Sequence, residues 1–141
     1  DPRTATASHA VPATVRYDLG DGATGRLNLL GSTDKLIRAI GWATWHPKQT
    51  PLVMQRTEDA TEAWFVGAYT GIAGGDESPA AARRIEVTAD GESVPAPEAL
   101  AVEIADATGT YIVLSSSEDR AYRAAGRTLR GPLAVIAVNA E

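Results

Sequence analysis

The residues best suited to contact a ligand are two tryptophans and a histidine close together near the middle of the chain. This candidate binding site consists of Trp42, Trp45, His46, Lys48 and Gln49. Indole faces stack on sugar rings through apolar contact, so an exposed pair suits the binding of a glycan. Lys48 and Gln49 would then supply polar contacts to hydroxyls or carboxylates. The alternative is that both indoles fill an open end of the fold, because tryptophan is highly buried on average.

The other residues with chemical potential do not form a catalytic or metal-binding pattern. His9 and His46 are the only histidines and lie far apart in the chain, so a metal would need carboxylate partners that the sequence does not place. The run Ser115–Ser117 lacks the glycines of a nucleophile elbow. The glycines between Gly71 and Gly75 lack the lysine of a phosphate-binding loop. We therefore expect no catalytic residue, no metal and no cofactor.

Composition and charge exclude several classes of partner. Lys and Arg number 13 against 18 Asp and Glu, for a net charge of −5, and Arg83-Arg84 is the densest basic pair. A nucleic-acid or anionic-membrane surface needs a concentrated basic patch, so the sequence disfavours both partners.

Cysteine is absent, which excludes disulfides and thiolate ligands. No stretch approaches the roughly 20 apolar residues of a membrane-spanning helix. The first residues also lack the layout of a signal peptide, so we expect a processed or excised piece.

Short alternating segments separated by turn residues predict an all-β fold, an antiparallel sandwich of nine to ten short strands with no long helix. Asp21-Gly22 predicts a tight turn between strands over 14–19 and 26–30, and Asp90-Gly91 predicts another. A third strand is expected over 36–40, followed by an aromatic-rich loop over 41–50. Residues 1–12 are expected to be a leading segment or linker, and 13–141 a single domain.

The stretch from Pro51 to Tyr69 is expected to organise the core. Two apolar runs, 51–56 and 63–69, flank a polar segment and predict an antiparallel hairpin. The second run is apolar on both faces and is predicted to be central in its sheet. The same argument makes the last strand, 133–138, central. Between 117 and 125 the sequence is compatible with a brief helix or with a short strand near Tyr122.

The order of these segments resembles the C-terminal β-sandwich of heparinase II/III-type polysaccharide lyases. The resemblance rests on the leucine-rich segment 25–32, the aromatic loop that ends at Pro47, the segments 51–57 and 62–69, and the closing segments 109–115 and 129–136. In such lyases the catalytic residues lie in an upstream helical toroid, and this chain contains no matching motif, so none is carried over.

The resemblance implies a non-catalytic accessory domain of a bacterial polysaccharide lyase, secreted or periplasmic. Its partners would be the upstream catalytic domain, whose substrate cleft it supports, and polysaccharide; without that domain, its apolar surface would be exposed or buried by self-association. Two alternatives remain open. One is a stand-alone carbohydrate-binding or adhesion module that uses the Trp42/Trp45 loop. The other is a small hydrolase or lyase that uses His46 with Tyr69 or Tyr122.

Overall fold

The computed structural model describes residues 6–8, 13–32, 35–42, 49–72, 81–106 and 109–138. These residues form strands, turns and connections, with no helix among them, and every strand pair is antiparallel. The strands of the described part are β1 Thr6–Ser8, β2 Ala13–Gly20, β3 Ala23–Gly31, β4 Lys35–Trp42, β5 Gln49–Arg56, β6 Phe65–Ile72, β7 Ala81–Ile85, β8 Val87–Ala89, β9 Glu92–Ser93, β10 Ala99–Asp106, β11 Gly109–Ser116, β12 Ala121–Ala124, β13 Arg127–Arg130 and β14 Leu133–Val138.

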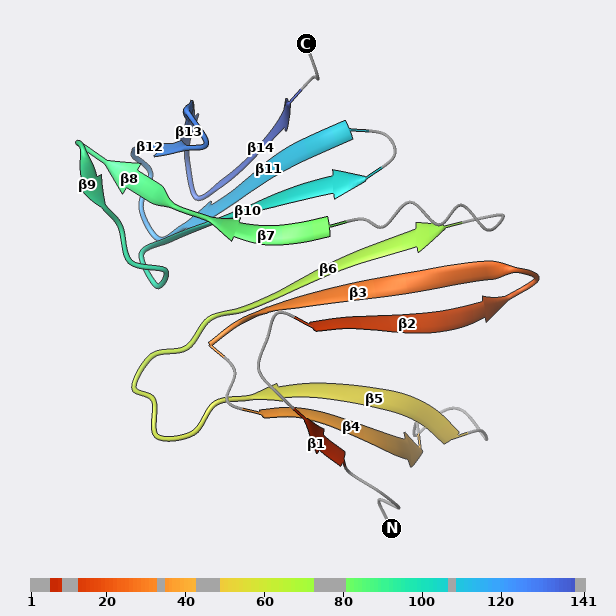
Figure 1. The fold of residues 1–141 in the computed structure, drawn as a ribbon. Helices are drawn as coiled ribbons and strands as arrows, with labels where there is room; N and C mark the ends of the chain where they lie inside the picture. The colour runs from red at the N-terminus through yellow and green to blue at the C-terminus, as the bar shows by residue number, and fades with distance from the viewer. Residues whose placement is uncertain are drawn as a thin grey trace.

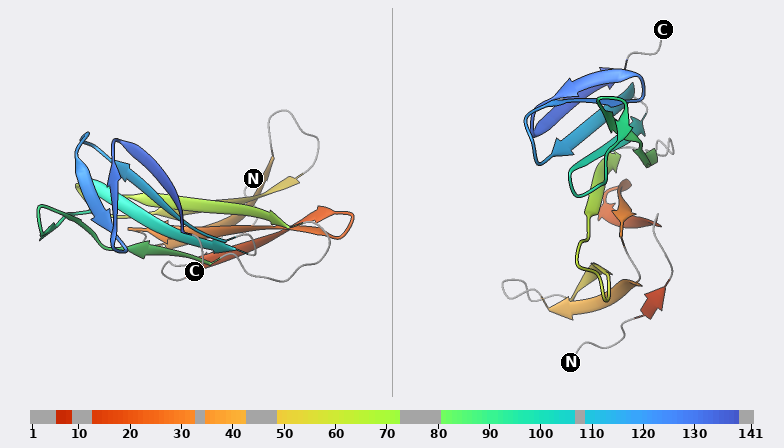
Figure 2. Two further views of the ribbon diagram at one scale, coloured as in Figure 1. Left: turned by 90° about the horizontal axis from the view of Figure 1, so that it is seen from above. Right: turned by 90° about the vertical axis from the view of Figure 1, so that its left-hand side faces the viewer.

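The strands form four small sheets, which confirms the predicted all-β antiparallel class. Their orders are β1-β4-β5, β2-β3-β6, β14-β11-β10-β7 and β13-β12-β8-β9. The last two sheets pack on each other as a sandwich at one end of the molecule, β2-β3-β6 follows, and β1-β4-β5 lies at the other end (Figures 1 and 2). The first strand, β1, pairs with Leu36–Arg38 of β4, so part of the segment expected to be a linker belongs to a sheet.

Local turn signals are confirmed. Asp21 and Gly22 join β2 to β3 with φ of 53° and 76°, and Asp90 and Gly91 join β8 to β9 with φ of 51° and 87°. Both central residues of a type I′ turn need positive φ, which Asp-Gly tolerates well. The segment around Tyr122 is a strand and not a helix, because β12 pairs with both β8 and β13.

The predicted hairpin over 51–69 is wrong. β5 pairs with β4, whereas β6 pairs with β3 in a different sheet. The connection over 57–64 carries the chain from one sheet to the other, so each arm meets a partner formed earlier in the sequence. β6 is an edge strand of β2-β3-β6 and not a central strand. Phe65 and Tyr69, for which a central strand predicts burial, are 49% and 58% exposed.

One further strand position and one loop length differ from expectation. β14 is an edge strand of its sheet rather than a central one. The predicted loop over 41–50 is shorter, because β4 continues to Trp42 and β5 already begins at Gln49. The continued ladder satisfies backbone donors and acceptors that a loop would leave to water or side chains.

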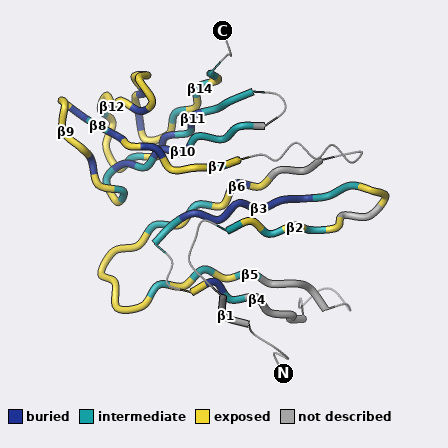
Figure 3. The backbone as a smooth tube through the Cα atoms, in the orientation of Figure 1, coloured by how far each residue is buried: buried dark blue, intermediate teal, exposed yellow. Residues whose placement is uncertain are grey.

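The main hydrophobic core lies in the C-terminal sandwich. Its fully buried side chains include Ile112, Leu114 and Tyr122, from strands of both sheets. Among the described residues before β7, burial concentrates in β3, where Leu29 and Leu30 are each 6% exposed. Figure 3 shows these two buried zones and the exposed connection between β5 and β6.

Candidate functional site

The structure describes only part of the site predicted from the sequence. Trp42 and Gln49 are directly opposite each other where β4 and β5 meet, so residues 43–48 connect the two strands of one hairpin. Trp45, His46 and Lys48 lie outside the described residues, and for Trp42 and Gln49 only the backbone is described. The register thus brings the two ends of the aromatic segment together, and the predicted glycan contact remains a prediction.

A second candidate site is a surface hollow of about 620 Å³ in the C-terminal sandwich. It lies where the chain leaves one sheet and enters the other: β7 ends at Ile85, Glu86 intervenes, and β8 begins at Val87. We call it the arginine hollow. Its lining residues are Arg83, Arg84, Ile85, Glu86, Thr88, Gly91, Arg123, Ala124, Ala125 and Gly126. Three of them are arginines, and one is a carboxylate.

Arg83 is held in place by the neighbouring strand. It lies directly opposite Glu103 of β10, and its Nε donates a hydrogen bond of 2.7 Å to Glu103 Oε1. The hydrogen bond, and then the charge, of Glu103 raise the pKa of Arg83 above its ordinary value. The guanidinium is therefore charged at every ordinary pH, and its other nitrogens are donors that the Glu103 bond does not use.

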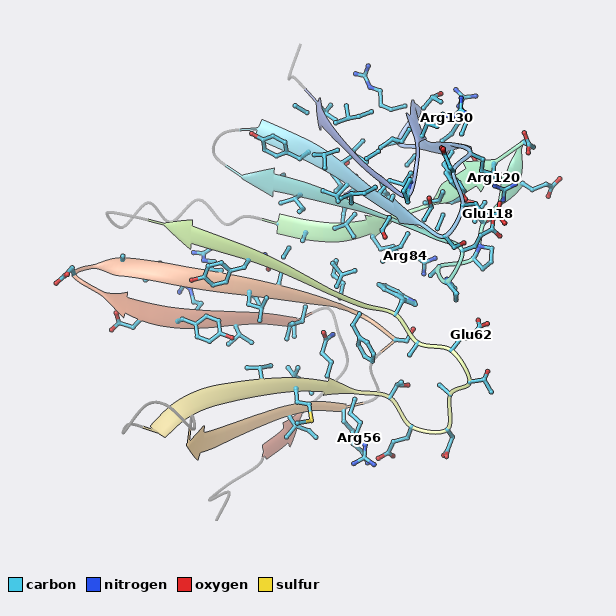
Figure 4. The ribbon with its side chains drawn as sticks, turned by 180° about the vertical axis from the view of Figure 1, so that it is seen from behind. Arg56, Glu62, Arg84, Glu118, Arg120 and Arg130 are labelled. Atoms are coloured by element: carbon cyan, nitrogen blue, oxygen red, sulfur yellow. The ribbon has the colours of Figure 1, made fainter. Side chains whose placement is uncertain are left out.

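Arg84 is oriented by an aromatic ring from the first half of the chain. Successive side chains of a strand point to opposite faces, so Arg84 leaves β7 on the face opposite to that of Arg83. Its guanidinium carbon lies 5.0 Å from the centre of the Trp64 ring, within the range of a cation–π contact. Figure 4 shows Arg84 on the side of the sandwich nearer to β6. This contact links the arginine hollow to the β5–β6 connection.

The third arginine comes from a different hairpin. Arg123 of β12 is opposite Thr88 of β8, which brings it to the β7–β8 crossover. The turn after β12 consists of Ala125 and Gly126, with φ of 46° and 72°, and it forms one wall of the hollow. Both residues of this turn are small and exposed.

The arginines that line the hollow supply donors that could bind an anion. Guanidinium groups present several N–H donors in a plane, which suits carboxylate, sulfate or phosphate oxygens. Within the described residues, no group of His, Asp and Glu could hold a metal ion. Tyr122, considered above as a catalytic partner of His46, is fully buried in the core, where its hydroxyl is out of reach of a substrate.

The sequence contains only part of the signal for this site. Arg83-Arg84 is visible as the densest basic pair, but nothing in the spacing places Arg123 beside it. Only the pairing of β8 with β12 brings the three arginines together.

Comparisons with known proteins give no relative: no family model, no curated protein and no solved structure matches this chain. The described residues also contain no helix that is long and apolar enough to cross a bilayer.

Proposed function

We propose that this protein is a non-catalytic β-sandwich module that binds an acidic polysaccharide in the arginine hollow. The observation that carries the proposal is that three arginines line one hollow of a chain whose net charge is −5: Arg83 and Arg84, from opposite faces of β7, and Arg123, from the neighbouring hairpin. A general electrostatic attraction to polyanions is not expected from such a chain, so a local cluster must supply the affinity. Uronic-acid carboxylates match the donors that the cluster presents.

The accessory role in a polysaccharide lyase fits this proposal. A module that holds one stretch of an acidic chain raises the local concentration of the rest at a linked catalytic domain. The proposal has two separate grounds: the resemblance of the segment order to the lyase sandwich, which comes from the sequence, and the three arginines that line the hollow, which come from the structure. Together they favour a module that presents polysaccharide to a partner domain.

The test is a calorimetric titration of the protein with uronic-acid oligosaccharides, carried out at low and at high salt. Wild type is expected to bind, with an affinity that falls as salt rises. Arg123→Gln removes one charged donor and should weaken binding about tenfold. Arg127→Gln is the matched control, because Arg127 is an exposed arginine of the same hairpin that does not line the hollow. Equal losses in both variants, or no binding by wild type, would contradict the proposal.

The alternative of a carbohydrate-binding module that uses the Trp42/Trp45 loop rests on the residue types of that segment. In the structure, Trp42 and Gln49 are opposite each other in the β4–β5 pair. Tryptophan fluorescence distinguishes the two sites. A shift caused by neutral oligosaccharides and lost in Trp45→Ala assigns binding to the loop, whereas a response to uronates that is lost in Arg123→Gln assigns it to the hollow.

A further inference from the structure

The C-terminal sandwich has four edge strands, and three of them are protected against pairing with another chain. Proteins blunt such edges with charged side chains or with very short strands. β7 contains Arg83 and Arg84, and β13 begins with Arg127 and ends with Arg130. β9 is only two residues long and begins with Glu92.

The fourth edge, β14, has none of these protections. Its sequence, Leu-Ala-Val-Ile-Ala-Val, contains no charge, no proline and no glycine. Among the described strands it pairs only with β11, along its full length. A strand with strong β propensity and an unprotected edge is a template for a further strand.

The surface beside this edge is apolar as well. Leu133 and Val135 of β14 are 68% and 61% exposed. The register places further apolar side chains on the same face of the sheet: Ala137 of β14, Tyr111 and Val113 of β11, and Leu100, Val102 and Ile104 of β10. This face is already covered toward β10, where Val102 is 5% exposed, and is open at β14. The opposite face of β14 packs on the core through Ala134, Ile136 and Val138. Sheets that are apolar on both faces are normally covered on both.

We propose that a second copy of this chain pairs with β14 in antiparallel orientation, so that two four-stranded sheets become one continuous sheet of eight strands. An antiparallel pair of identical strands has a two-fold axis, so the contact closes after two copies and satisfies both free edges at once. The absence of charge in Leu133–Val138 means that two acidic molecules meet there without like charges opposed. The exposed side chains of Leu133 and Val135 would join those of the second copy in one shared patch.

Sedimentation analysis of the full chain over a range of concentrations tests this proposal. Wild type is expected to be a dimer, and Val135→Lys a monomer with an unchanged circular dichroism spectrum, since it places two lysines beside the axis. Met54→Lys is the matched control, because Met54 is 57% exposed on β5, in a different sheet, and should leave the dimer intact. A wild type that is monomeric at every soluble concentration overturns the proposal, and so does a dimer that survives in Val135→Lys.

The absence of cysteine allows a second measurement that does not depend on the stability of a lysine variant. Across an antiparallel pair, opposed residues are about 5 Å apart at their Cα atoms, within the range that a disulfide spans. Val135→Cys should thus form a covalent dimer under mild oxidation, much faster than Met54→Cys at the same concentration. Equal rates for the two variants would place the contact elsewhere. Neither measurement involves the arginine hollow, so a failure here leaves the proposed function untouched.

Discussion

At the scale of single residues, Arg120 lies among three carboxylates. Its guanidinium forms an ion pair with Glu98, lies 3.4 Å from Glu118 Oε2 and 3.8 Å from Asp90 Oδ2, and stacks 5.3 Å from the centre of the Tyr122 ring. Arg120 and Glu118 lie close together at one end of the sandwich (Figure 4). One side chain thereby connects the β8–β9 turn, the segment before β10 and the segment before β12.

Arg120→Gln should lower the melting temperature clearly, because it leaves three carboxylates near one another without their shared cation. Arg130→Gln is the control: within the described part of the chain, Arg130 has a single exposed ion pair, 3.6 Å from Asp119, and such pairs contribute little. Thermal unfolding followed by circular dichroism compares the two. Equal melting temperatures would mean that the Arg120 cluster is only a surface feature.

Tyr122 presents a separate test, because its hydroxyl is buried and makes no hydrogen bond of ordinary geometry with the described residues, although its interaction with the nearby Arg120 guanidinium raises the pKa of Arg120. Tyr122→Phe keeps the ring in the core and removes this polar group. The free energy of unfolding should therefore stay unchanged or rise by about 1 kcal/mol. Tyr122→Leu, which loses the ring, should lower it by more than about 1 kcal/mol. A clear loss of stability in Tyr122→Phe, measured by urea unfolding, would show that the hydroxyl has a partner.

At the scale of elements, the end of β3 is fixed by a glycine. Gly31 has φ of 148°, and a Cβ built on it would lie 2.5 Å from the carbonyl oxygen of Trp64. That oxygen accepts a hydrogen bond of 2.9 Å from the Ser32 N–H, so it cannot move away freely. The contact determines how closely β3 approaches the start of β6.

Gly31→Ala is expected to destabilise the protein by about 2–3 kcal/mol, through backbone strain together with the collision at Trp64. Gly91→Ala separates the two effects, because Gly91 also has positive φ, 87°, but no atom lies within 4 Å of the position that a Cβ would take there. Urea unfolding should show the larger loss for Gly31→Ala. Equal losses would mean that φ alone decides the cost.

The strands and turns could be predicted from the sequence, but the strand pairs could be predicted only in part. The Asp-Gly turns and the strand character of most segments follow from local residue preferences, and the structure confirms both. The partner of β6 does not follow from local residues, because the strand that pairs with it, β3, lies before β4 and β5 in the chain. The arginine hollow likewise depends on pairing between segments that are distant in the sequence. Arg83 and Arg84 are adjacent in sequence, but Arg123 joins them only through sheet pairing.

At the scale of the whole molecule, burial is unequal between the two halves. The main core cluster contains residues from Ile85 to Leu129, packed against Ala134, Ile136 and Val138. The strands before β7 form two three-stranded sheets with fewer buried side chains among the described residues. One contact between these two sheets is the hydrogen bond of 3.2 Å from Gln55 Nε2 to the Leu30 carbonyl.

Amide hydrogen exchange should reflect this difference. The slowest amides are expected in β10, β11 and β12, because opening them requires exposure of the main core. Amides of β4 and β5 should exchange faster, since their sheet opens without disturbing that core. Measurement by mass spectrometry of peptic fragments would show this ranking directly. Uniform protection along the chain would mean that both halves open as one unit.

The crossing of the chain between sheets over 57–64 also has a kinetic consequence. The second partner of β3 is β6, which follows β4, β5 and the 57–64 connection in the sequence. The sheet β2-β3-β6 is therefore complete only after those segments have been synthesised. Pairing between distant segments requires loop closure before any contact is gained, and folds dominated by such pairing form in milliseconds to seconds. During that interval β3 is paired with β2 on one side and has no partner on the other. During synthesis, which proceeds from the N-terminus, β3 therefore lacks its second partner until β6 has left the ribosome.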